Sequence, residues 1–307
     1  MLHVVDTIIP IFVIILLGFV LRTVGLLSSN ITGPLNRLVY YIAIPALIFD
    51  AVAGAPFHAN FNSLLLTGTL APIVMVFLIA MGIAYLFSIP RYHMGTFLQA
   101  AFHGNLGYIG FAVCYYFLGN EGLTRASILA AFVMILQNFL GVFGLQVFSE
   151  GNKERHATVF IIKSIIVNPV ILSALAGILF SILNIVLPTT VARSLKIISG
   201  MALPLALLVI GASLSFSVIK SHIWLTLGTG LLKLFVLPAL GLWLYKFFGL
   251  PASQFLPGMI LLACPTATLT YVMASQMHGS TDLASASVSM NTLLSSLTFI
   301  FWLSFFS

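Results

Sequence analysis

Long apolar runs alternate with short polar connections along the whole chain. Runs free of Asp, Glu, Lys and Arg reach about 20 residues, the length that a transmembrane helix needs. Their continuous hydrophobicity favours helices, because strands of a membrane barrel would show shorter segments of alternating polarity. The pattern predicts an all-α polytopic membrane protein with ten transmembrane helices. The predicted spans are 6–26, 35–54, 63–87, 94–118, 125–148, 160–182, 190–214, 221–246, 254–276 and 283–305.

Composition excludes a water-soluble globular protein. Of 307 residues, 61% are hydrophobic and 6% are charged, and the mean hydropathy is +1.17, whereas soluble domains carry about 25% charged residues. The formal charge of +6 comes from basic residues scattered between apolar runs, which argues against nucleic acid as a partner. Cys114 and Cys264 both lie in apolar segments, so we expect no disulfide framework, metal site or cofactor. The predicted environment is the lipid bilayer.

The basic residues predict how the chain is oriented. Ten spans place both termini on one side, and the connections after the odd-numbered spans then carry more Lys and Arg than the opposite side. Because cytoplasmic loops are enriched in these residues, we predict that the N- and C-termini are external. The predicted cytoplasmic set is Arg22, Arg37, Arg91, Lys153, Arg155, Lys163 and Lys220, and the external set is Arg125, Arg193, Lys196 and Lys246.

A shift of 159 residues aligns the two halves of the chain without a gap. Each half has five predicted spans, an odd number, so the second half enters the membrane in the opposite orientation. Inverted repeats of this kind are typical of secondary transporters. We predict a 5+5 inverted repeat with its first half at 1–148, a cytoplasmic linker at 149–158 and its second half at 159–307. The aligned pairs are Pro10 with Pro169, Gly18 with Gly177, Arg37 with Lys196, Pro45 with Pro204 and Gly82 with Gly241.

The fourth and ninth predicted spans are interrupted at corresponding depths. The fourth contains AFHGNLGYIG at 101–110, and the ninth contains LACPTATLTY at 262–271. Glycine weakens a helix, and proline removes a backbone donor and clashes with the preceding turn. The N-termini of the resulting half-helices offer unpaired N–H groups and positive dipole ends, which suit a carboxylate. The alternative interpretation is that the glycines allow close helix packing and that Pro265 is a simple kink.

The two interruptions define the candidate site. Transporters with inverted repeats bind substrate near the midplane, at broken helices of the two halves. Asn138, Gln99, Gln137 and Asn291 are further polar residues that could line the cavity, with interhelical hydrogen bonding as the alternative. The residues expected to bind substrate are Asn105, Gly107, Tyr108, Pro265, Thr266, Thr268 and Lys233, and those expected to form helix breaks or hinges are Gly104, Gly110, Pro45 and Pro204.

Lys233 is predicted to lie at the bilayer midplane. It is thirteen residues from Lys220 and thirteen from Lys246, so it lies about 20 Å from either end of its span. A cation at that depth costs about 3 kcal/mol and normally faces a cavity or a partner. Two roles are open, a counter-charge for an anion and a structural lysine paired with backbone carbonyls.

Titratable groups near the breaks suggest the charge of the substrate. No Asp or Glu lies in the middle of a predicted span, which disfavours a sodium/proton antiporter with a buried carboxylate pair and favours an anionic substrate. His103 lies beside the first break and could couple protons, because histidine titrates near neutral pH. An ordinary interhelical hydrogen bond is the alternative role of this histidine.

Four segments in order resemble one family over essentially the whole chain. They are LNRLVYYIAIPALIFDAV in span two, NLGYIGFAV in span four, KLFVLPAL in span eight and CPTATLTYVMASQ in span nine. Together they are similar to the auxin efflux carrier family, which includes bacterial malate and malonate permeases and the plant PIN-FORMED auxin exporters. The short central linker is like that of the bacterial members, so we expect a bacterial inner membrane protein.

The resemblance implies a fold similar to that of the bile-acid symporters. That fold has a scaffold bundle and a transport bundle, whose fourth and ninth spans cross. It also implies that the asparagine of the fourth-span motif, Asn105 here, binds a substrate carboxylate near the crossing. The ninth-span segment departs from the plant pattern, because Thr266 stands where an asparagine follows proline in the plant exporters. This difference disfavours auxin and favours a small organic acid.

The expected function is secondary transport of small organic anions, such as mono- or dicarboxylates, by an elevator-type movement of the crossed-helix bundle. A homodimer and coupling to H⁺ or Na⁺ are open. The alternatives are a sodium-coupled symporter of the bile-acid type, a channel-like sensor and, more distantly, an intramembrane enzyme. The sequence lacks HExxH, GxSxG and paired midplane carboxylates, so an enzyme is not expected.

Overall fold

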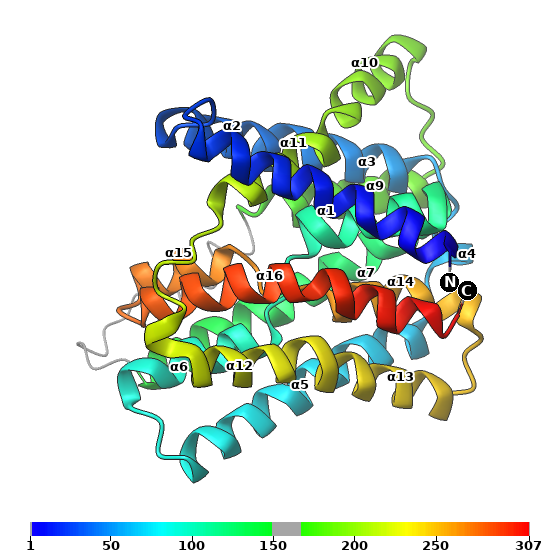
Figure 1. The fold of residues 1–307 in the computed structure, drawn as a ribbon. Coiled ribbons are helices and arrows are strands. Elements are labelled where there is room, and N and C mark those ends of the chain that lie inside the picture. The colour runs from blue at the N-terminus through cyan, green and yellow to red at the C-terminus, as the bar shows by residue number, and fades with distance from the viewer. Residues whose placement is uncertain (1, 149–166, 307) are drawn as a thin grey trace.

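The computed structural model describes residues 2–148 and 167–306, and these residues are organised as helices (Figure 1). The first part contains α1 (Leu2–Thr23), α2 (Ser29–Leu38), η1 (Val39–Ala43), α3 (Ile44–Ala53), α4 (Phe57–Asn60), α5 (Ser63–Leu86), α6 (Arg91–Phe102), η2 (Leu106–Gly110) and α7 (Phe111–Phe148). The second contains α9 (Pro169–Ile182), α10 (Thr189–Gly200), α11 (Ala202–Ser213), η3 (Lys220–His222), α12 (Ile223–Leu231), η4 (Leu232–Val236), α13 (Leu237–Phe247), α14 (Ala252–Ala263), α15 (Leu269–Gln276) and α16 (Thr281–Ser304).

Within the described residues, seven helices are long and apolar enough to cross a membrane, which confirms an all-helical polytopic membrane protein. Two shorter apolar helices, α9 and α14, accompany them. The fourth and fifth predicted spans meet in α7, where Gly119 has a left-handed φ of 70° that divides the helix. The linker predicted at 149–158 lies outside the described residues. The long helices are Asn30–Ala53, Leu106–Phe148, Thr189–Ser213, Lys220–Phe247, His3–Thr23, Ser63–Leu86 and Thr281–Ser304.

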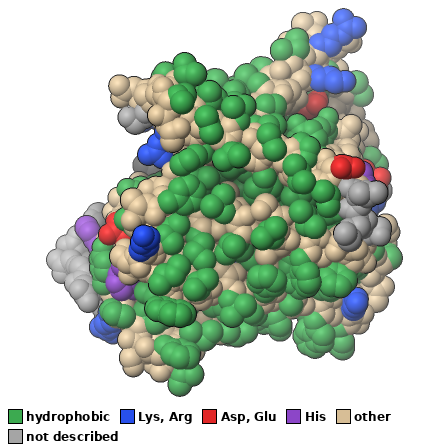
Figure 2. Space-filling view, viewed as in Figure 1, with side chains coloured by type: hydrophobic (Ala, Val, Ile, Leu, Met, Phe, Trp, Pro, Cys, Tyr) green, Lys and Arg blue, Asp and Glu red, His purple; other side chains and the backbone are tan. Residues whose placement is uncertain are grey.

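The surface agrees with a lipid environment. Large apolar side chains such as Trp224 and Phe247 are 82% and 73% exposed. Apolar side chains cover most of the face in Figure 2, and charged side chains lie mainly toward its edges. Both termini lie at the same end of the helix bundle (Figure 1), an arrangement that an even number of crossings produces.

Two helices of the first half pack on two helices of the second half. The first helix, α1, packs on α11, and α9 packs on α3. A Cβ added at Gly18 or Gly211 would lie 2.2 or 1.8 Å from a backbone oxygen of the facing helix, so only glycine permits this approach of α1 and α11. At Gly177 in α9, a Cβ would lie 2.9 Å from Val52 Cβ in α3. Gly18 and Gly177, paired by the 159-residue shift, therefore occupy corresponding positions in the α1–α11 and α9–α3 contacts.

Prolines inside the helices lie beside irregular backbone, and at Pro238 a side chain satisfies the carbonyl that the proline frees. A proline has no N–H for the carbonyl four residues earlier. Pro238 follows the π-helical turn η4, and the Trp302 indole donates to Leu234 O at 2.8 Å. Pro45 similarly follows the π-helical turn η1. Pro204 lies just after Met201, which divides α10 from α11. Pro45 and Pro204, two of the four residues predicted as helix breaks or hinges, thus lie beside irregular backbone, and their hinge role stays a prediction.

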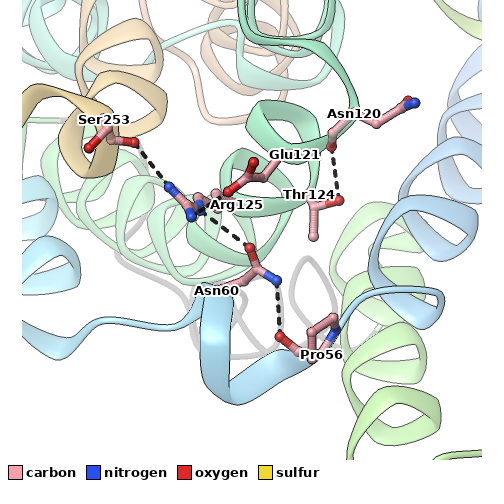
Figure 3. A network of polar contacts seen from close by, with 7 residues as sticks. All are labelled: Pro56, Asn60, Asn120, Glu121, Thr124, Arg125 and Ser253. Atoms are coloured by element: carbon pink, nitrogen blue, oxygen red, sulfur yellow. Dashed lines mark hydrogen bonds and ion pairs between the residues drawn. The ribbon is translucent and has the colours of Figure 1, made fainter.

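Arg125 joins three elements at one end of the bundle (Figure 3). Pro257 frees the carbonyl of Ser253 in α14, and Arg125 Nη1 donates to it at 3.0 Å. The same guanidinium donates to Asn60 Oδ1 in α4 at 3.3 Å and pairs with Glu121 one turn earlier in α7. The guanidinium therefore fixes α14 and the short α4 against α7.

Replacing Arg125 should destabilise this end of the bundle. We expect Arg125→Met to lower the free energy of unfolding by about 2 kcal/mol, because a charge-assisted hydrogen bond to Ser253 O is lost. Thermal unfolding of purified protein in detergent measures the effect. Lys246→Met is the matched control, since Lys246 is exposed and bonds to no described side chain. Equal unfolding temperatures of the two variants would contradict the conclusion that Arg125 holds α14 and α4 against α7.

Candidate functional site

Two broken helices meet at the centre of the molecule. The helix α6 ends at Phe102 and α14 ends at Ala263, and a short extended segment follows each of them. These segments pair in an antiparallel bridge between Gly104 and Thr266. Asn105 N donates to Pro265 O at 2.8 Å, and Ala267 N donates to His103 O at 2.9 Å. The interruptions at 101–110 and 262–271 therefore lie side by side, and we call these two paired segments the crossing.

Small residues make the pairing sterically feasible. A Cβ added at Gly110 would lie 2.9 Å from Cys264 Sγ. A Cβ at Gly104 would lie 3.2 Å from Leu106 Cδ2, a tight contact, and 3.4 Å from Lys233 Cε. Pro265 restricts the preceding residue to extended backbone, and Cys264 has a ψ of 142°. The glycines and the proline therefore act through backbone shape and close packing at the crossing.

Side chains satisfy the carbonyl ends of the two half-helices. The last carbonyls of a helix have no intrahelical donor. At the end of α6, Thr266 Oγ1 donates to Ala100 O at 2.8 Å, and Gln137 Nε2 donates to Phe102 O at 3.1 Å. Asn291 Nδ2 from α16 donates to the same Thr266 hydroxyl at 2.8 Å. Thr266 is therefore engaged in holding the crossing together.

Lys233 donates a hydrogen bond to a carbonyl in the last turn of α14, the other half-helix. Its side chain is fully buried, and Nζ donates to Leu262 O at 2.7 Å. A cation at a helix C-terminus also interacts favourably with the negative end of the helix dipole. This contact corresponds to the structural role considered for Lys233, and its contact with substrate stays a prediction.

A cavity of about 190 Å³ adjoins the crossing. Of the predicted site residues, Asn105, Gly107, Tyr108 and Thr268 line it, as do His103 and Gly104. Pro265, Thr266, Lys233 and Gly110 lie at the crossing but outside the lining, and Pro45 and Pro204 lie on α3 and α11. The complete lining is Asn36, Tyr40, His103, Gly104, Asn105, Leu106, Gly107, Tyr108, Met134, Gln137, Asn138, Asn168, Val170, Ala267, Thr268, Leu269 and Val272.

Sequence reasoning missed three polar lining residues. Asn36 and Tyr40 lie on the α2–η1 helix, and Asn168 caps the N-terminus of α9. The pattern Asn168-Pro169 is a recognisable helix start, because asparagine is a good N-cap and proline is favoured at the first helical position. No local signal marks Asn36 or Tyr40 as cavity residues, since their place depends on packing between distant segments.

The cavity offers hydrogen-bond donors without formal charge. No Lys, Arg, Asp or Glu is among its described lining residues. Gly107 and Tyr108 lie in the first turn of the helix that continues into α7, and Thr268 precedes α15. First-turn N–H groups have no intrahelical acceptor. Asn105 Nδ2 is buried and has no hydrogen-bond partner among the described residues. Such a set of unpaired donors suits an anion.

His103 contacts Gln99 beside the cavity. Its ring Nδ1 lies 3.3 Å from Gln99 Nε2, and its ring stacks on Phe102. Among the described residues, no cluster of three or more His, Cys, Asp or Glu could hold a metal ion. Proton coupling by His103 stays a prediction.

A second cavity of about 460 Å³ adjoins the first. Asn36, Tyr108, Thr268 and Val272 line both cavities. Tyr108 donates to Asn36 Oδ1 at 2.7 Å, so this hydrogen bond lies at their junction. The larger cavity is also lined by Arg22, near the end of α1, and by four serines. These are Ser213, Ser215, Ser285 and Ser289.

Comparison with known proteins identifies the family. The model of a family described as "Membrane transport protein" matches residues 3–303. The chain belongs to this family. The resemblance to the auxin efflux carriers is thereby confirmed, and the protein is a membrane transporter rather than an enzyme.

Relatives of this auxin efflux carrier family member span nearly its full length. It is 28% identical to an "Uncharacterized transporter" of Methanothermobacter thermautotrophicus, over 97% of this chain and 96% of that protein. It is 26% identical to a "Putative malonate transporter" of Rhizobium meliloti, over 97% of this chain and 94% of that protein. A transporter of Methanocaldococcus jannaschii is 23% identical over 97% of each chain.

Removing the Lys233 ammonium should destabilise the crossing of this family member. In Lys233→Met, Leu262 O would be buried without a donor, a loss that costs about 1–3 kcal/mol. We expect a lower unfolding temperature in detergent, partly restored in Lys233→Arg, which keeps a donor and a charge. An unchanged unfolding temperature in Lys233→Met would show that the contact with Leu262 O does not stabilise the crossing.

Proposed function

We propose that this protein is a secondary carrier of small organic anions, and that it binds a carboxylate in the cavity beside the crossing. The observation that carries the proposal is the meeting of two half-helix N-termini at a cavity lined by Asn105, whose Nδ2 lacks a partner. A carboxylate oxygen accepts from amide and backbone N–H groups, and the positive ends of the helix dipoles favour its charge.

The size and lining of the cavity support a small acid. Drug-sized ligands usually occupy pockets of about 300–1,000 Å³, and this cavity measures about 190 Å³. Met134, Val170 and Leu269 supply apolar surface for a short carbon chain. The relative named as a malonate transporter supports the same substrate class, mono- or dicarboxylates.

We also propose the ten-span 5+5 inverted repeat. Crosswise packing of α1 on α11 and of α9 on α3 supports it, because a two-fold related duplication would produce such a pair of contacts. Breaks in both α6–η2 and α14–α15 support it as well. In the proposed orientation, both termini are external and the membrane is the bacterial inner membrane.

An elevator-type movement would carry the crossing and its bound anion across the membrane. The cavity is lined on one side by the crossing and on the other by residues of α2, η1 and α9, such as Asn36, Tyr40 and Val170. Alternating access requires one of these sets to move relative to the other. The cavity at their boundary therefore supports a carrier with two positions of the crossed helices.

Replacing Asn105 tests the site. We expect Asn105→Ala to lower carboxylate uptake into proteoliposomes by at least about tenfold, because the cavity loses a donor at the crossing. Asn120→Ala is the control, since Asn120 is an exposed asparagine in α7. Uptake at the wild-type rate by a folded Asn105→Ala protein would contradict the site.

The same assay assigns the coupling ion. Uptake is measured with sodium, with choline in its place, and with an imposed proton gradient. A sodium requirement would favour the symporter of the bile-acid type, and a response to the proton gradient would favour proton coupling.

A further inference from the structure

The ammonium of Lys233 is buried without a counter-charge. Among the described residues, Lys233 is the only Asp, Glu, Lys or Arg whose side chain is buried. Its Nζ donates one hydrogen bond, to Leu262 O, whereas an ammonium has three donors. No carboxylate pairs with it in the described part of the chain. A charge inside a membrane protein is costly and marks a candidate functional group.

Two titratable groups face Lys233. The helices α6 and α14 pack on η4, and His103 and Cys264, which follow them at the crossing, interact electrostatically with Lys233. The other helices that pack on η4 place no charged group beside it. In α5 and α12 there is no Asp, Glu, Lys, Arg or His, and Asp282 and Lys246 lie in the first turn of α16 and the last turn of α13.

Lys233 also adjoins the candidate site. Gly104 lines the cavity, and a Cβ built on it would lie 3.4 Å from Lys233 Cε. The segment at Gly104 therefore contacts both the cavity and the lysine side chain. An opposite charge favours the charged form of a titratable group, and most strongly where water is excluded. An anion bound beside Gly104 therefore favours the protonated form of Lys233.

Buried polar side chains lie between α12 and α16, which run side by side (Figure 1). Thr229 Oγ1 donates to Ser287 Oγ at 3.1 Å. One turn further along α16, Asn291 Oδ1 lies 2.7 Å from a Cβ built on Gly230. Lys233 follows on the same face of the helix, because residues three and four apart are neighbours there. We call this set the seam, and its members are Thr226, Thr229, Gly230, Ser287 and Asn291.

The seam contains oxygens that a chain of water molecules would satisfy. Thr226 Oγ1 and Asn291 Oδ1 are fully buried and have no hydrogen-bond partner among the described residues. Buried oxygens of this kind usually bind water. One turn before Thr226, the chain reaches His222, whose ring lies 5.1 Å from that of His93. The seam therefore extends from Lys233 to a pair of imidazoles at the end of α12.

We propose that Lys233 is the proton-binding group of this carrier, and that protons reach it through the seam. The inference rests on the proposed function, in which the cavity holds an anion. The neutral amine accepts one proton and becomes an ammonium when the anion binds, and it gives up that proton when the anion leaves. Both forms keep an N–H donor for Leu262 O. Under the proposed orientation, the imidazoles lie at the cytoplasmic end of the seam.

Arginine separates a proton-binding role from a structural one. Lys233→Arg keeps a cation and a donor for Leu262 O but does not release its proton at ordinary pH. Malonate binding to purified protein is measured by calorimetry from about pH 7 to about pH 9. Buffers with different ionisation enthalpies give the number of protons that are taken up. Lys233→Gln, which keeps a neutral donor, is the second variant if arginine destabilises the fold.

The expected result is proton uptake by the wild type alone. Its affinity should fall with rising pH by up to about tenfold per pH unit, with up to about one proton taken up per malonate. In Lys233→Arg, the affinity should change less than about twofold over the same range, with no proton taken up. Lys233→Gln should bind malonate more weakly and also without proton uptake.

Three results would overturn the role of Lys233 and leave the carrier standing. They are proton uptake that persists in the Lys233 variants, proton uptake that is lost in His103→Gln but not in Lys233→Arg, and malonate binding by the wild type without proton uptake. Failure of the folded wild type to bind malonate, succinate or propionate would instead overturn the proposed function together with this inference.

A separate variant tests the seam. Thr226→Val keeps the shape of the side chain and removes the unpaired hydroxyl. We expect slower malonate uptake into proteoliposomes under a proton gradient, with unchanged proton uptake on binding in detergent, because only the route is altered. Thr292→Val is the control, since Thr292 is also buried with an unpaired hydroxyl but lies outside the seam. Equal transport rates of the two variants would overturn the seam as the route.

Discussion

The need to satisfy broken backbone inside a membrane governs the centre of this protein. Hydrocarbon offers no hydrogen bonds, so an interrupted helix is tolerated only where protein or a water-filled cavity supplies partners. Here the two interruptions supply each other, through Asn105 N to Pro265 O and Ala267 N to His103 O. One break alone would leave these groups unpaired, so the two broken helices depend on each other.

At the crossing, the carbonyl ends of the half-helices are hydrogen-bonded by side chains, whereas the N–H ends face the cavity. This difference decides which groups the cavity presents. The carbonyl ends of α6 and α14 are satisfied by Thr266, Gln137 and Lys233. The N–H ends, near Gly107 and Thr268, line the cavity. A ligand therefore meets donors and positive dipole ends, while the negative ends are closed off by protein.

The sequence predicted the parts that depend on local pattern. Uncharged apolar runs gave the membrane helices, and the glycines and Pro265 marked both breaks, because hydrophobicity and backbone permissiveness are properties of short segments. The motifs also identified the family, which the full-length match confirms. Partners across the bundle could not be read in this way. Lys233 pairs with a carbonyl 29 residues away, and Thr266 binds a carbonyl 166 residues away, so their roles depend on how distant helices pack.

The cavities differ in how close they lie to the proposed site. The small cavity shares Asn36, Tyr108 and two other lining residues with the cavity near Arg22. It shares none of the described residues that line a third cavity around Asp50, Arg125 and Arg193, toward the other end of the bundle. Under the proposed orientation, the site therefore lies next to the cavity on the cytoplasmic side, and the hydrogen bond from Tyr108 to Asn36 lies between the two cavities. Exchange with the external side then requires the crossing to move relative to α2 and α9, because residues of those helices form the opposite part of the lining.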